Sequence, residues 1–138
     1  MSEIITLDSN VFRNQRFFDW LTSLESPHVK HVFPLLTFIE VLVWYEMRGL
    51  TRNDLEDDLT KIKTEIVEFS LDYVNQLMSN IRSNPRFLFR HHTREFLIGT
   101  IVQQKDSLLI TNNKRHFAWL SPQKVVSPEE YLSMCLSP

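Results

Sequence analysis

The stretch Ile4-Ile5-Thr6-Leu7-Asp8-Ser9-Asn10 decides the fold that we expect for this chain. Its first four residues are apolar or β-branched, and a polar Asp-Ser-Asn turn follows them, which is typical of a short buried strand. An acid in this place lies at the carboxyl end of the strand. Asp8 is therefore the first candidate for a functional side chain.

Beyond this stretch, the chain alternates between strand-like and helix-like segments. Further strands are predicted at residues 32–36, 66–69, 107–111 and 124–126, with helical patterns between them. Such alternation predicts an α/β fold with a mostly parallel sheet of five strands. Parallel strands that are joined by right-handed crossovers end at one common edge, where ligands of such sheets bind.

Two further acids are expected near that edge. Glu40 ends the segment Thr37-Phe38-Ile39-Glu40, which has the pattern of a helix capping box after the second strand. Glu95 opens the predicted helix 95–104, which leads into the fourth strand, so Glu95 reaches this edge only if its helix starts there. Three carboxylates that converge repel one another unless a cation neutralises them, and a hard divalent cation does so best.

Each of these acids also has an ordinary interpretation. Glu40 can serve only as a capping residue, Glu95 only as an acid in the first turn of a helix, and Asp8 only in an Asx-turn with Asn10. Likewise, Asn112-Asn113 can be a simple turn after the fourth strand. The functional interpretation depends on the conjunction and spacing of these residues.

Composition limits the classes of protein that fit. The chain has 138 residues, of which 43% are hydrophobic and 23% are charged, and this predicts one globular domain over residues 1–138. The formal net charge of -2 argues against a protein that binds nucleic acid over a broad basic surface. Basic residues nevertheless cluster locally, at Arg86, Arg90, Arg94, Lys114 and Arg115.

Targeting and redox signals point to the cytoplasm. The single cysteine, Cys135, excludes an internal disulfide framework and a zinc site built from cysteines. The longest apolar run, residues 32–45, is too short and too polar to span a bilayer, so we expect no membrane association. The N-terminal residues lack the pattern of a secretory signal.

The order of the segments resembles that of the PIN-domain nucleases, in particular the small single-domain toxins of VapC type. The resemblance covers nearly the whole chain and rests on five segments in order, residues 4–12, 35–42, 94–100, 108–117 and 127–132. It implies a doubly wound sheet of strand order 3-2-1-4-5 with helices on both faces. It also implies an acidic pocket that binds Mg²⁺ or Mn²⁺ and cleaves RNA, a small antitoxin partner and a homodimer.

The resemblance also implies roles for individual residues. Asp8, Glu40 and Glu95 are the expected metal ligands, and Thr111 and Asn113 complete the expected catalytic site. Glu95 and Asn113 stand where the family often has Asp. Glu95 keeps the negative charge but adds a methylene, whereas Asn113 keeps an oxygen ligand without the charge, which favours one metal ion over two. The expected contacts with RNA come from four residues, Asn10, Arg94, Lys114 and Arg115.

Two other functions compete with a metal-dependent endoribonuclease. The departures at Glu95 and Asn113 allow a degenerate domain that binds RNA or protein without cleaving it. A phosphorylatable receiver domain also has an acid at the end of a strand. It fits less well, because the third predicted strand has no Asp at its end.

Overall fold

The computed structural model describes residues 3–24 and 29–136. Within them, five strands form one sheet in the order β3-β2-β1-β4-β5, and all neighbouring strands are parallel. The strands are β1 (Glu3–Leu7), β2 (Val29–Pro34), β3 (Thr64–Val67), β4 (Leu108–Ile110) and β5 (Val125–Val126). The predicted α/β architecture and its strand order are confirmed. The central strand of the sheet is β1, which Asp8 follows directly.

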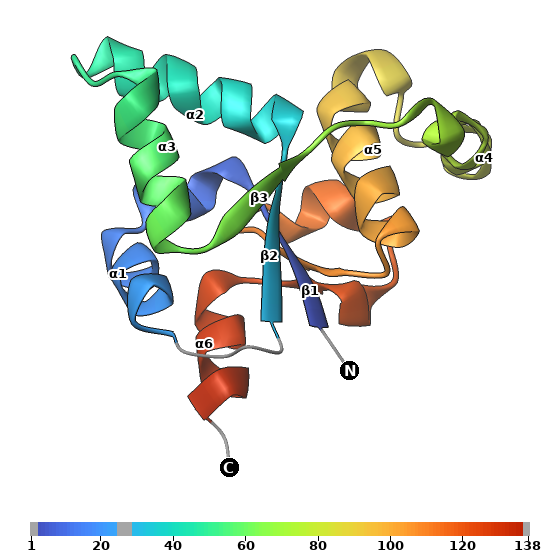
Figure 1. The fold of residues 1–138 in the computed structure, drawn as a ribbon. Coiled ribbons are helices and arrows are strands. Elements are labelled where there is room, and N and C mark those ends of the chain that lie inside the picture. The colour runs from blue at the N-terminus through green and yellow to red at the C-terminus, as the bar shows by residue number, and fades with distance from the viewer. Residues whose placement is uncertain (1–2, 25–28, 137–138) are drawn as a thin grey trace.

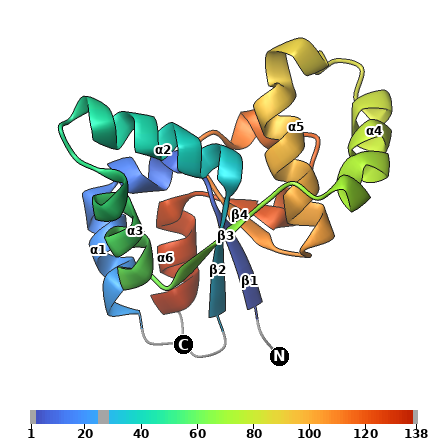
Figure 2. The ribbon, with the colours of Figure 1, turned by 45° about the horizontal axis from the view of Figure 1, so that its top comes forward.

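Helices cover both faces of this sheet, as Figure 1 and the rotated view of Figure 2 show. On one face lie α1 (Gln15–Ser23), α2 (Leu35–Met47), α3 (Arg52–Lys61) and α6 (Pro128–Leu136). On the other face lies α5 (Phe89–Gln104), with α4 (Val74–Ser83) packed beside it. The sheet is therefore doubly wound, as the resemblance implied.

The alternation of side chains along the strands explains why both faces are covered. In β1, Ile5 and Leu7 point into the larger hydrophobic cluster, whereas Ile4 packs against the cluster on the opposite face. In β4, Ile110 joins the larger cluster and Leu109 joins the side of α5. A strand that is apolar on both faces needs helices on both sides to exclude water.

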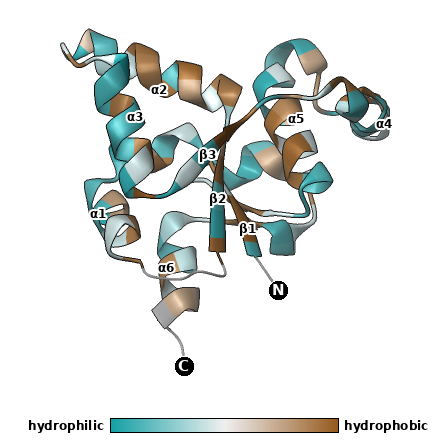
Figure 3. Ribbon diagram, in the orientation of Figure 1, coloured by the Kyte–Doolittle hydropathy of each residue, from teal (hydrophilic) through white to brown (hydrophobic). Residues whose placement is uncertain are grey.

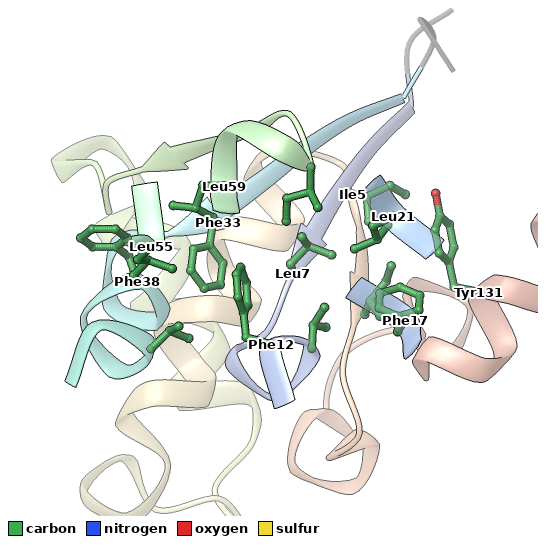
Figure 4. Packing of buried hydrophobic residues seen from close by; sticks show 14 of the residues in the cluster. Ile5, Leu7, Phe12, Phe17, Leu21, Phe33, Phe38, Leu55, Leu59 and Tyr131 are labelled. Carbon is green, nitrogen blue, oxygen red and sulfur yellow. The ribbon is translucent and has the colours of Figure 1, made fainter. Parts of the chain in front are cut away.

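Aromatic side chains fill much of the larger cluster, which Figure 4 shows from close by. The ring centroids of Phe12 and Phe33 lie 4.9 Å apart, which links the residues after β1 to β2. Trp20 of α1 meets Tyr131 of α6 edge to face, with 5.8 Å between ring centroids. These contacts anchor the last helix to the first half of the chain.

Local boundaries differ from the prediction around Pro34. The strand predicted at 32–36 ends at Pro34, and α2 begins immediately afterwards. Thr37 therefore lies inside the first turn of α2, where its hydroxyl donates to the carbonyl of Pro34 at 2.6 Å. The predicted capping box of Thr37 and Glu40 is wrong, because the helix starts earlier than the pattern suggested. Likewise, the strand expected at 66–69 is β3 at Thr64–Val67.

Other helix ends follow the sequence closely. Ser127 and Glu130 form a capping box at the start of α6, since the Ser127 hydroxyl accepts from the Glu130 amide and the Glu130 carboxylate accepts from the Ser127 amide, both at 3.1 Å. Helix α5 starts before its predicted first residue, Glu95, and contains a non-helical residue at His92 (φ -130°, ψ 23°). This kink matters for the site described below.

Hydrophobic residues are distributed unevenly among the helices, and Figure 3 shows α2 as largely hydrophobic and α3 as largely hydrophilic. On α2, large apolar side chains recur every fourth residue and are exposed, namely Leu35, Ile39, Val43 and Met47. Residues four apart share one face of a helix, so these four form an apolar stripe. Among the described residues, no helix is both long and apolar enough to cross a membrane.

Candidate active site

Asp8 follows β1 directly and is fully buried. Its amide donates to the carbonyl of Ile110 at the end of β4, at 3.1 Å. Its side chain caps the short 3-10 helix η1 (Ser9–Arg13), because Oδ1 accepts from the Ser9 amide at 2.7 Å. The hydroxyl of Thr111 donates to Oδ2 at 2.7 Å. Both carboxylate oxygens are therefore held in fixed positions.

Thr111 follows β4 and joins three predicted site residues into one network. Besides donating to Asp8, its Oγ1 accepts from the Asn113 amide at 3.0 Å and from Nδ2 of Asn10 at 3.4 Å. The Asn10 side chain in turn accepts from the Asn112 amide at 3.4 Å. Asn113 enters this network through its main chain, and the residue itself is exposed.

Glu40 reaches the same edge from α2. Because β2 ends at Pro34 and the helix begins at once, Glu40 lies in the second turn, close to the carboxyl ends of the strands. Its Oε2 is engaged by Arg94 at 2.6 Å. Its Oε1 is buried and has no hydrogen-bond partner among the described residues. The carboxylate therefore still offers one acceptor to the site.

Arg94 joins the two acids. It comes from α5, and its Nε donates to Glu40 Oε2 while its Nη2 donates to Asp8 Oδ1. The same Nη2 lies 3.0 Å from the hydroxyl oxygen of Ser9, which accepts a further bond. The side chain of Arg94 is 24% exposed and that of Asp8 is 0% exposed, so much of this bridge is shielded from water. Two carboxylates that are far apart in sequence thus converge on one guanidinium.

The electrostatics of the bridge favour the charged guanidinium. Burial is the largest influence on the pKa of Arg94 and lowers it, but the hydrogen bond to Glu40 and the charge of Asp8 outweigh burial and raise the pKa above its ordinary value. Arginine is protonated in proteins at any accessible pH. Loss of a proton from Arg94 therefore cannot break the bridge.

Glu95 points elsewhere. Consecutive residues of a helix differ by about 100° in direction, so Arg94 and Glu95 cannot both face the same point. The Glu95 carboxylate lies 3.3 Å from Nδ1 of His116, which belongs to the 3-10 helix η3 (Lys114–Phe117). Its side chain is largely buried. Glu95 is thus near the edge of the sheet but is paired with a histidine.

The donors that converge suit a hard cation in part. Asp8 and Glu40 offer carboxylate oxygens, which Mg²⁺ and Mn²⁺ prefer, and Oε1 of Glu40 is without a partner among the described residues. Within residues 3–24 and 29–136, however, no three His, Cys, Asp or Glu side chains are grouped so as to hold a metal. Two carboxylates fit a cation that keeps several waters, and in this structure the guanidinium of Arg94 lies between them.

The predicted RNA contacts are divided between the network and the surface. Asn10 and Arg94 belong to the hydrogen-bonded network around Asp8. Lys114 and Arg115 are exposed on η3, and Lys114 forms an ion pair of 2.8 Å with Glu130 of α6. An exposed pair of this kind contributes little free energy and exchanges readily, so Lys114 remains accessible to an anion.

Two participants were missed in the sequence. Ser9 accepts from Arg94, and the Asp-Ser-Asn turn that contains it was a usable signal. His116 pairs with Glu95, but nothing in its sequence context indicated that η3 would approach α5. Pairings between distant helices depend on how the helices are rotated, which a pattern of apolar residues leaves open.

An apolar groove lies between α2 and α5, the helices that carry Glu40 and Arg94. It has a volume of about 200 Å³ and is lined by Pro34, Leu35, Leu36, Ile39, Phe69, Leu97, Ile98 and Ile101. Leu35 and Ile39 are also the first two members of the apolar stripe on α2. The groove therefore adjoins the exposed apolar surface of α2.

Comparison with known proteins gives the fold a precedent. No family model matches the chain, and no curated protein matches it. Among solved structures, a chain of a toxin–antitoxin complex from Klebsiella pneumoniae has a TM-score of 0.68 at 19% identity, covering 90% of this chain and 97% of that one. A chain of VapBC-1 from nontypeable Haemophilus influenzae has a TM-score of 0.65 at 13% identity, covering 91% and 98%.

A third structure agrees with these two. A chain of VapBC2 from Rickettsia felis, bound to a DNA fragment from its promoter, has a TM-score of 0.57 at 14% identity, covering 90% of this chain and 98% of that one. The fold of the present chain is thus PIN-like and resembles chains of VapBC complexes over nearly its full described length.

Proposed function

We propose that this chain is a PIN-domain toxin, a metal-dependent endoribonuclease that hydrolyses phosphodiester bonds of RNA. The observation that carries the proposal is the convergence of Asp8 and Glu40 on one cationic group at the carboxyl edge of the sheet. That edge is where α/β sheets bind their ligands. The likeness of the fold to chains of toxin–antitoxin complexes supports the same assignment.

The residues of the chain would divide the work as follows. Asp8 and Glu40 would hold Mg²⁺ or Mn²⁺, with Glu95 entering the site once its side chain turns from His116. When bound, such an ion supplies an activated water and neutralises charge on the phosphate. Thr111 would keep Asp8 oriented through their 2.7 Å hydrogen bond.

Substrate would be gripped mainly outside this buried network. Lys114 and Arg115 are exposed on η3, directly after the turn that contains Asn113, and would contact neighbouring phosphates of the RNA. The side chains of Asn10 and Asn113 would orient the scissile phosphate or a water molecule. Because only a few basic side chains contact phosphates here, we expect the cleavage rate to fall with salt less steeply than for a broad basic surface.

The apolar groove between α2 and α5 suits a protein partner. We propose that a small antitoxin lays an apolar helix along Leu35 and Ile39, a mode of binding that matches a groove flanked by helices. The exposed Val43 and Met47 on the same face of α2 support the further proposal that two copies of the chain associate.

The decisive experiment is cleavage of a generic single-stranded RNA by the purified chain with Mg²⁺, Mn²⁺ or excess chelator. Cleavage should require a divalent ion, and Asp8→Asn and Glu40→Gln should each lower its rate by roughly two orders of magnitude or more. Glu46→Gln is the matched control, because Glu46 is exposed on the same helix α2 and lies outside the network. Cleavage that persists unchanged in chelator or in Asp8→Asn would contradict the proposal.

A second function, binding without cleavage, is favoured by one observation. Arg94 occupies the space between the two carboxylates, and the third predicted ligand, Glu95, is paired with His116. A degenerate domain would bind RNA with an affinity that divalent ions do not change, and would release no shortened product in any metal. The same cleavage assay, run beside a binding assay, separates the two functions.

A further inference from the structure

We propose that Arg94 is a built-in competitor for the divalent cation: its guanidinium fills the position between Asp8 and Glu40, so that its ion pairs and a bound metal exclude each other. This inference rests on the proposed function for its biological meaning. It concerns the regulation of the same site. The test below, however, measures metal binding and does not depend on RNA cleavage.

The first argument is geometric. Arg94 engages Glu40 Oε2 at 2.6 Å and bonds to Oδ1 of Asp8, so one oxygen of each carboxylate is already taken. The other oxygen of Asp8 is bonded to Thr111. Oε1 of Glu40 has no partner among the described residues, but both oxygens of Asp8 are engaged, so a metal shared by the two acids competes with the guanidinium for Asp8.

The second argument is energetic. A fully buried carboxylate such as that of Asp8 is costly without a positive partner, and removing one member of a buried pair leaves an uncompensated charge. Two acids this close also repel each other when both are ionised. Arg94 offsets both costs in the absence of metal, so metal binding must replace what Arg94 contributes.

The third argument concerns how Arg94 can leave. It lies two positions after His92, the residue at which α5 departs from helical geometry, and its side chain is partly exposed to solvent. A phosphate group of bound RNA is a strong alternative partner for a guanidinium, since both can form two parallel hydrogen bonds. Binding of RNA would therefore draw Arg94 away from the acids and make room for the metal.

The test is Mn²⁺ binding to the RNA-free protein, measured by calorimetry and by electron paramagnetic resonance of the free ion. If Arg94 fills the position for about 90% of the time or more, the apparent dissociation constant of the native chain is weakened by about tenfold or more. Arg94→Gln should recover that factor. Arg90→Gln is the matched control, because it removes an exposed positive charge of the same helix without touching the acids.

Several outcomes decide the proposal. Tighter binding in Arg94→Gln, with Arg90→Gln unchanged, supports it, and adding Asp8→Asn to Arg94→Gln should abolish the gain. Equal affinity in the native chain and Arg94→Gln overturns it, as does an equal gain in Arg90→Gln, which would indicate a general effect of charge. Should Arg94→Gln be unfolded without metal, circular dichroism during Mn²⁺ titration replaces calorimetry: metal-driven refolding supports the proposal, and its absence overturns it.

The same experiments, combined with the cleavage assay, test the nuclease proposal separately from the competition. If Arg94→Gln binds Mn²⁺ more tightly while the native chain cleaves no RNA with Mg²⁺ or Mn²⁺, the competition stands and the nuclease proposal fails. If the native chain cleaves RNA with Mn²⁺ while Arg94→Gln gains no affinity, the nuclease proposal stands and the competition fails.

Discussion

At the scale of single residues, the site is a set of short bonds around one buried carboxylate. Asp8 is held by Thr111, by the amide of Ser9 and by Arg94, each from a different part of the chain. Every one of these partners satisfies an oxygen that water cannot reach. Small changes in any partner should therefore be felt both in stability and in the alignment of Asp8.

Thr111→Val is the sharpest test at this scale. Valine has the shape of threonine without its hydroxyl, so Oδ2 of Asp8 would lose its 2.7 Å bond while remaining buried. An unsatisfied buried acceptor costs about 1–3 kcal/mol, and we expect the free energy of unfolding in urea to fall by that amount. The proposed metal-dependent cleavage should fall as well.

Two variants control this prediction. Thr111→Ser keeps a hydroxyl and should recover most of the lost stability. Thr60→Val removes an exposed hydroxyl that bonds only within its own helix, to the carbonyl of Glu56 at 2.9 Å, and should change stability by less than about 0.5 kcal/mol. A loss in Thr60→Val as large as that in Thr111→Val would argue against a special role for the bond to Asp8.

At the scale of elements, the orientation of α5 decides which residues face the edge of the sheet. The convergence of Asp8 and Glu40 was predictable, because each follows a parallel strand and such strands end together. The choice between Arg94 and Glu95 was not, because they are neighbours on one helix and the kink at His92 alters how that helix enters. Periodicity identifies a helix but does not fix its rotation to within one residue.

Contacts across elements also explain which boundaries were missed. The pattern Thr37-x-x-Glu40 is an ordinary capping signal, and only the end of β2 at Pro34 showed that the helix begins earlier. The capping box at Ser127 was predictable, because a proline at the first helical position and a glutamate at the third reinforce it. Local signals were reliable where several agreed.

Gly99→Ala tests the packing of α5. A Cβ at this position would lie 2.4 Å from Cη2 of Trp119, closer than atoms can approach, and 3.3 Å from Cδ1 of Leu120, a tight contact. We expect the clash to cost about 1–3 kcal/mol, which exceeds the roughly 1 kcal/mol that alanine contributes to helix propensity. Thermal unfolding should reveal a lower midpoint. In a Trp119→Ala background the same substitution should instead be neutral or stabilising, and destabilisation there would refute the clash.

At the scale of the whole molecule, the parallel sheet and the position of the site follow from one alternating pattern, whereas the strand order was implied by the resemblance to the PIN-domain nucleases. Short apolar runs between helical segments were enough to predict the five parallel strands, and these runs can be seen in the sequence. The sequence did not predict how the charged side chains pair at this edge, as in Arg94–Glu40 and Glu95–His116. Such pairs form between segments whose rotation is set by the packed core as a whole.

Acid stability of the folded chain provides a prediction at this scale. Burial lowers the pKa of His31 from its ordinary value of 6.5 to about 4, and a hydrogen bond with the backbone of Ile62 opposes this only in part. The unfolded chain therefore takes up a proton at His31 as the pH falls below about 6.5, while the folded chain resists until about 4. The free energy of unfolding should decline over that window, by roughly 3 kcal/mol in total.

His31→Leu should remove this decline, since leucine binds no proton and suits the apolar neighbours of β2. His91→Leu, at an exposed position, should keep it. Urea unfolding across the same pH range measures the difference. An equally steep decline in His31→Leu would assign the acid sensitivity to other groups.

The bridge that Arg94 makes has a consequence for how the molecule comes into being. If the two carboxylates had no positive partner within the chain, folding of the site would require a bound cation. A newly made chain would then depend on the free manganese or magnesium in its surroundings. Here the guanidinium of Arg94, a part of the chain itself, serves as the counter-ion of Asp8 and Glu40. The chain can thus fold to completion first, and the proposed binding of a metal ion becomes a later, separate event.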